Sequence, residues 1–123
     1  MNRRQLDLLC LSWPGVTSDI KWGEDLVYSV AAKMIAVLWL EGDHFKRISF
    51  KVPDELFLAL TEQPGIAPAP YLARHKWISL TDPAAFGDDW LASQLRISYE
   101  LVAAKLPQKT RQSLSLPTAR TRR

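Results

Sequence analysis

The first apolar pattern along the chain has the period of a helix. Apolar side chains recur at positions i, i+3, i+4 and i+7, which places them on one face of a helix. Pro14-Gly15 follows and ends the pattern. We therefore predict a first helix over about residues 2–12. Its apolar stripe consists of Leu6, Leu9, Cys10 and Trp13.

Short segments with the period of a strand come next. Residues 20–22 and 26–30 are predicted strands on either side of a turn-like Gly-Glu-Asp cluster. Residues 33–40 form the strongest predicted strand, because both of its faces carry apolar side chains. A strand of this kind is normally central in its sheet and covered on both sides, or one face meets another subunit.

The strand predicted over residues 45–52 has one apolar face. Its other face carries Arg47 and Lys51 together with a serine and a phenylalanine. Since side chains alternate between the two faces of a strand, we expect the face with the cations to be at least partly wet.

Two helices and one strand complete the pattern. Pro53 suits the first turn of a helix, where its missing N–H costs nothing, and that helix ends at residues 63–65. Residues 77–80 form the next predicted strand. Asp88 is the predicted N-cap of the last helix, and Pro107 stops it.

These elements define a fold class. Sequential strands joined by short turns pair antiparallel, and helices can cover the resulting sheet. We therefore predict an α+β fold with a single antiparallel sheet of about five strands covered by three helices. Residues 1–107 form one domain, and residues 108–123 form a basic, flexible tail.

Charge is unevenly distributed along the chain. The 123 residues include 16 Lys and Arg and 13 Asp and Glu, for a net charge of +3. Five of the basic residues, and no acidic one, follow Leu106. A basic surface indicates nucleic-acid binding only when it belongs to the domain. The basic tail is either simply solvated or attracted to phosphates without sequence preference.

Composition favours an ordinary cytoplasmic protein. With 47% hydrophobic residues the chain is typical of globular proteins. The single Cys10 cannot form an intramolecular disulfide, which favours a reducing compartment. Apolar runs are far shorter than the roughly 20 residues of a membrane span, and Asp7 interrupts the one that could serve as a secretory signal. We expect no association with membranes.

The sequence shows no recognisable catalytic or metal-binding motif. The best metal ligands, Cys10, His44 and His75, are isolated from one another. The five glycines are scattered and form no phosphate-binding loop. Adjacent carboxylates are better explained as turn and cap residues. We therefore expect no catalytic residues, no metal, no cofactor and no enzymatic activity.

The segment from Tyr71 to Trp77 is the most suggestive of binding, because three potential cations lie between two aromatic residues. Such interleaving suits phosphate contacts combined with base stacking, or a small anion. In the alternative interpretation the two aromatic side chains pack in the core and the basic residues face water. The predicted contact residues for nucleic acid or an anion are Arg47, Lys51, Tyr71, Arg74, His75, Lys76 and Trp77.

Several segments spread over residues 2–107 carry a further signal through their order and spacing. They are residues 11–16, 33–36, 48–52, 64–66, 70–71, 76–78 and 98–107. Together they resemble the MmcQ/YjbR family of small proteins. The resemblance implies a CyaY-like α+β fold. It also implies DNA binding, because the family is often labelled so from a likeness of its paired structural units to winged-helix elements.

The residues and the resemblance together lead to two function hypotheses. One is a DNA-binding module that contacts phosphates through the predicted basic residues. The other is a non-enzymatic binding module for a protein partner or a small anionic ligand, in which exposed aromatic residues such as Trp39 form the interface. Frataxin relatives of the fold carry acidic residues on the first helix for iron. Residues 2–7 hold one acid and two arginines, so we do not expect iron binding.

Overall fold

The computed structural model describes residues 1–22, 25–42 and 44–114. A six-stranded sheet in the order β1-β2-β3-β4-β6-β5 forms its centre, and all neighbouring strands are antiparallel. The strands are β1 (Val16–Lys21), β2 (Asp25–Val30), β3 (Lys33–Glu41), β4 (His44–Lys51), β5 (Ile66–Pro68) and β6 (Trp77–Leu80). Because β3 lies inside the sheet, its predicted central position is confirmed.

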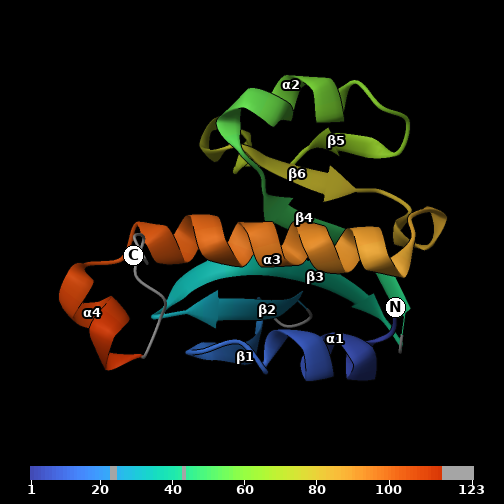
Figure 1. Ribbon diagram of the computed structural model, residues 1–123. Coiled ribbons are helices and arrows are strands. Elements are labelled where there is room, and N and C mark those ends of the chain that lie inside the picture. The colour runs from blue at the N-terminus through green and yellow to red at the C-terminus, as the bar shows by residue number, and fades with distance from the viewer. Residues whose placement is uncertain (23–24, 43, 115–123) are drawn as a thin grey trace.

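Helices α1 and α3 lie on the same face of the sheet, and α2 packs beside β5 and β6 (Figure 1). The α+β class predicted from the sequence is therefore confirmed. The helices are α1 (Arg3–Cys10), α2 (Asp54–Thr61), α3 (Asp88–Ala104) and α4 (Gln108–Ser113), with short 3-10 turns η1 (Ala73–His75) and η2 (Pro83–Ala85).

The described residues contain one strand and one α-helix more than the sequence predicts. The added strand β5 has only three residues and pairs with β6 alone. It ends at Pro68, and a proline is tolerated at the end of such an edge strand. The added helix α4 begins after Pro107, within the predicted tail. Residues 115–123 lie outside the described residues, so the flexible tail stays a prediction there.

Among the predicted element boundaries that change, those of β1 and α3 have a clear physical reason. Strand β1 begins at Val16 rather than at residue 20, and every side chain after Val16 in this edge strand is exposed. It therefore lacks the apolar alternation that would have revealed it. The N-cap of α3 is Gly87, not Asp88. Asp88 instead occupies the first turn, where the helix dipole favours an acid, and accepts a hydrogen bond of 2.9 Å from the N-terminal ammonium group.

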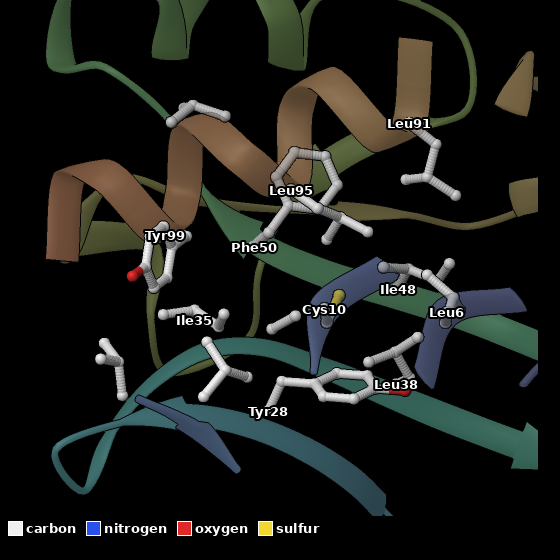
Figure 2. Packing of buried hydrophobic residues seen from close by; sticks show 14 of the residues in the cluster. Leu6, Cys10, Tyr28, Ile35, Leu38, Ile48, Phe50, Leu91, Leu95 and Tyr99 are labelled. Carbon is white, nitrogen blue, oxygen red and sulfur yellow. The ribbon is translucent and has the colours of Figure 1, made fainter. Parts of the chain in front are cut away.

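The hydrophobic core lies between the sheet and the helices α1 and α3. The apolar stripe predicted for the first helix points into it (Figure 2). Burial, with the nearby Asp7, raises the pKa of the Cys10 thiol to about 12, as expected for a structural cysteine. Prominent core side chains are Leu6, Cys10, Tyr28, Ile35, Leu38, Ile48, Phe50, Leu91, Leu95 and Tyr99.

Hydrogen bonds from α3 join the segments that carry the family resemblance. Ser98 is completely buried. Its Oγ donates to the carbonyl oxygen of Ile35 at 2.7 Å and accepts from the backbone N–H of Lys51 at 3.0 Å. The hydroxyl of Tyr99 donates to the carbonyl oxygen of Pro14 at 2.7 Å. The helix therefore holds the beginning of β3, the end of β4 and the turn after α1 in one arrangement.

The turn between β2 and β3 has a backbone conformation that its residues do not favour. Ala31 and Ala32 have φ values of 49° and 65°, and hairpin turns of this kind prefer Asn-Gly. Each residue with a Cβ costs roughly 1–2 kcal/mol in the left-handed region. We therefore expect Ala32→Gly to raise the free energy of unfolding by about 1 kcal/mol, measured by urea denaturation.

The control for this turn is the same substitution in a regular helix. Ala92→Gly, within α3, should instead destabilise by roughly 0.5–1 kcal/mol, because glycine loses more backbone entropy on folding. A loss of stability in both variants would contradict the assignment of strain to the turn.

Candidate functional site

The face of the sheet opposite α1 and α3 is the candidate site, and we call it the outer face. Strand register places Met34, Val37 and Trp39 of β3 on it, opposite Ser29, Val27 and Asp25 of β2. Of the two alternatives for this strand, coverage of both faces within the chain is wrong for Trp39, which is 46% exposed. The other alternative, that one face meets another subunit, stays a prediction. Helix α3, which packs on β3 and β4, lies on the other face of the sheet, where the core is.

A groove of about 480 Å³ crosses the outer face. Its floor is mainly apolar and includes Met34 and Val37. One wall comes from the segment 69–72, which connects β5 to β6. We call this feature the aromatic groove and define it by Trp22, Met34, Val37, Trp39, Arg47 and Tyr71.

Three aromatic side chains of the groove are unusually open to solvent. The exposed fractions are 70% for Trp22, 46% for Trp39 and 99% for Tyr71. Trp22 and Tyr71 also have positive φ values of 52° and 65°, which side chains larger than glycine rarely adopt. Exposed apolar surface and strained backbone both concentrate at binding sites. Their coincidence singles out this groove from the rest of the described surface.

Arg47 places a positive charge next to the aromatic surface. It is the register partner of Trp39 across β3 and β4, and directly opposed side chains on antiparallel strands are close enough to interact. The half-buried guanidinium-bearing side chain belongs to the same groove lining as Trp39 and Tyr71. The groove therefore offers planar apolar contacts with a cation beside them, and its lining also includes the acidic Asp25, the register partner of Trp39 on β2.

A second hollow of about 280 Å³ adjoins the groove, and both have Met34 and Leu72 in their linings. It lies where β3 and β6 begin and where β4 and α3 end. Apolar walls come from side chains such as Trp77 and Val102. We call it the basic pocket and define it by Lys33, Lys51, His75 and Lys105.

Lys51 is the most constrained cation of the basic pocket. Its Nζ donates a hydrogen bond to the carbonyl oxygen of His75. Burial, and then repulsion by Lys105, lower the pKa of the Lys51 ammonium group, while Asp54 acts in the opposite direction and Lys76 adds further repulsion. Burial and the neighbouring cations therefore disfavour the charged form of Lys51 in the pocket.

The structure divides the predicted contact residues among several places. Arg47 and Tyr71 line the aromatic groove. Lys51, His75 and Trp77 line the basic pocket, and Trp77 is only 5% exposed. For Trp77 the structure therefore matches the alternative of a packed side chain, and for Tyr71 it does not.

The remaining two predicted residues belong to neither lining. Arg74 donates from Nε to Nε2 of its neighbour His75 at 3.3 Å. The ammonium group of Lys76 lies 5.3 Å from the centre of the Phe57 ring on α2. The cations of residues 74–76 therefore do not form one patch. Arg74 contacts His75 of the basic pocket, and Lys76 contacts Phe57 of α2.

Some site residues gave no local signal in the sequence. Lys105 is an ordinary cation at the end of the last predicted helix, and Trp22 is the last residue of the strand predicted over residues 20–22, whereas β1 ends at Lys21. Both become part of the site only because distant strands and helices meet there. Among the described residues, no group of three or more His, Cys, Asp and Glu side chains is placed to hold a metal. No described helix is long and apolar enough to cross a membrane.

These features define a class of small α+β proteins with helices on one face of the sheet and a groove on the other. A crystal structure of a Deinococcus radiodurans protein, described as a DUF419 domain, has this fold. It matches with a TM-score of 0.81 and 27% identity, over 93% of this chain and 88% of that chain. A Pseudomonas syringae protein of known structure matches with a TM-score of 0.66 and 25% identity, over 82% of this chain and 98% of that one.

The family follows from a match to the YjbR family model over residues 11–101. The chain therefore belongs to the YjbR family, also called MmcQ/YjbR or DUF419, and the resemblance found in the sequence is confirmed. A comparison with curated proteins gives no match.

Proposed function

We propose that this YjbR family member is a non-enzymatic DNA-binding module that holds an unpaired strand on its outer face. The observation that carries the proposal is the aromatic groove, in which three exposed aromatic side chains lie beside Arg47. Proteins that bind single strands commonly combine such aromatic surfaces with cations that follow the phosphate backbone.

Base stacking explains why the proposal names an unpaired strand. Stacking on an aromatic side chain is worth roughly 1–3 kcal/mol per base and requires a base whose face is accessible. Trp39 and Tyr71 offer such surfaces, and the adjoining basic pocket would receive the phosphates of a strand that leaves the groove. A duplex keeps its base faces stacked on each other, so it would use only the cations.

Local placement of charge matters more here than net charge. Once the last three arginines are set aside, the chain has as many basic as acidic residues. A general electrostatic attraction to DNA is therefore weak for residues 1–119. Affinity must come from stacking and from a few cations, so we expect a shallow dependence on salt concentration.

The test is fluorescence anisotropy with a labelled single strand and the duplex of the same sequence, at low and near-physiological salt. We expect the full chain to bind the single strand more tightly. A variant with Arg120, Arg122 and Arg123 replaced by glutamine should retain that preference, which separates the domain from the basic end of the chain. Loss of all binding in this variant would attribute the effect to the tail and contradict the proposal.

Two substitutions separate stacking from phosphate contact. Trp39→Ala should weaken binding roughly 5- to 100-fold at every salt concentration and leave the salt dependence unchanged. Arg47→Ala should reduce the slope of log affinity against log salt by about 0.7, the value for one phosphate contact on a single strand.

Matched controls exist for both substitutions. Leu58→Ala removes another large exposed apolar side chain, on α2. Lys46→Ala removes a neighbouring cation of β4, which is paired with Glu41 at 2.7 Å. Neither should change affinity. Equal losses in Trp39→Ala and Leu58→Ala would refute the stacking role, and the apolar groove would then favour the other hypothesis from the sequence, a protein partner.

A further inference from the structure

We propose that the basic pocket is a binding site for a phosphate monoester. Lys33, Lys51 and Lys105 gather there with His75 from four separate parts of the chain. The inference goes beyond the proposed function, because the phosphate group can belong to a small phosphorylated molecule as well as to the phosphorylated end of a DNA strand.

The pocket collects cations without a carboxylate in its lining. The ion pairs found among residues 1–22, 25–42 and 44–114 involve Met1, Lys46 and Arg96, and none of the pocket's lysines. Like charges in one hollow repel each other, and a bound anion relieves that repulsion. The arrangement therefore favours a negatively charged ligand over a neutral one.

Charge and size point to a single phosphate group. A phosphate monoester carries close to two negative charges at neutral pH, which suits several lysines better than one carboxylate does. A volume of about 280 Å³ lies just below the usual range for whole small-molecule ligands. The apolar walls that Val102 and Leu106 provide strengthen charge interactions by excluding water.

The state of Lys51 gives the site a pH dependence with a definite sign. Burial, Lys105 and Lys76 lower the pKa of Lys51, and Asp54 opposes them. Since a bound dianion favours the charged ammonium group, phosphate affinity should fall as pH rises through this lowered pKa. The stability of the unliganded fold should rise over the same window, because folded Lys51 releases its proton before unfolded lysine does.

The experiment follows the full chain by two-dimensional ¹H–¹⁵N NMR during titration with inorganic phosphate, with chloride at equal ionic strength as reference. We expect saturable shifts of the amides of Lys33, Lys51 and His75, and a phosphate-specific increase of the melting temperature. Shifts that chloride reproduces, or that lie elsewhere in the protein, would overturn the proposal.

A double variant tests the lysines directly. Lys51→Gln with Lys105→Gln should weaken phosphate binding at least 10-fold and leave the circular dichroism spectrum unchanged. Lys109→Gln removes one charge from an exposed position on α4 and should leave affinity as it is. Unchanged phosphate binding in the double variant would also overturn the proposal, and the NMR mapping on the natural chain does not depend on how the variants fold.

Two further probes identify the source of the phosphate. Tighter binding of a 5′-phosphorylated strand than of its 5′-hydroxyl form, lost in the double variant, would support a strand end. Binding of ribose 5-phosphate without any such preference among strands would support a small molecule. The two proposals fail separately, because Trp39→Ala should weaken strand binding and leave inorganic phosphate binding intact.

Discussion

Replacing Ser98 with alanine is expected to lower the free energy of unfolding by about 2–4 kcal/mol. Its buried hydroxyl donates a hydrogen bond to the carbonyl oxygen of Ile35 and accepts one from the backbone N–H of Lys51. Alanine would leave both groups without that partner, and an unsatisfied buried group costs roughly 1–3 kcal/mol. Urea denaturation followed by circular dichroism measures the loss.

Ser93→Ala is the matched control for this prediction. Ser93 belongs to the same helix and is exposed, so its substitution should change stability by less than about 0.5 kcal/mol. A loss of similar size in both variants would mean that the Ser98 hydrogen bonds contribute nothing special. If Ser98→Ala folds, its phosphate affinity is also expected to fall, because Ser98 holds the backbone of Lys51 at the basic pocket.

The hydrogen bonds of Ser98 and Tyr99 also show how the segments used to predict the fold from the sequence are connected in the structure. The short segments that resemble the YjbR family are scattered along the chain, yet α3 joins three of them through the hydrogen bonds of Ser98 and Tyr99. Helical periodicity predicted the buried face of α1 because Leu6 and Cys10 recur at its spacing. Local patterns of this kind suffice for elements that pack against one core.

The site was less accessible to prediction. The apolar side chains on both faces of β3 show that each face meets something apolar, but they do not show which face a helix covers. The meeting of Lys33, Lys51 and Lys105 depends on where α3 ends relative to the sheet. Such juxtapositions arise from tertiary packing and leave no spacing in the chain.

The aromatic residues of the predicted patch show the same limit. Tyr71 and Trp77 looked equivalent in the sequence, since each flanks the cations of one short segment. Pairing of β6 with β4 places Trp77 beside Lys51 on the outer face, where Trp77 is only 5% exposed, while Tyr71 adopts a left-handed backbone conformation and projects into solvent. Burial and backbone conformation, not residue type, therefore separate a structural aromatic side chain from a binding one.

Trp77→Ala should consequently lower the free energy of unfolding by about 3–5 kcal/mol, as expected for truncation of a large buried aromatic side chain. Trp77 is 5% exposed, and its carbonyl oxygen accepts a hydrogen bond of 3.0 Å from Ala69, at the start of the segment that carries Tyr71. Trp39→Ala should cost less than about 1 kcal/mol, because its side chain is 46% exposed.

Measured together, these two substitutions test whether the buried tryptophan stabilises the fold and the exposed tryptophan binds the ligand. Urea denaturation should rank Trp77→Ala as the more harmful change to stability, and anisotropy with a single strand should rank Trp39→Ala as the more harmful change to binding among folded variants. Both rankings follow from burial, because strand register places both tryptophans on the outer face, but Trp77 is 5% exposed and Trp39 is 46% exposed. If Trp77→Ala keeps full stability and loses strand binding, then Trp77 rather than Trp39 contacts the ligand, and the proposed position of the strand on the groove is wrong.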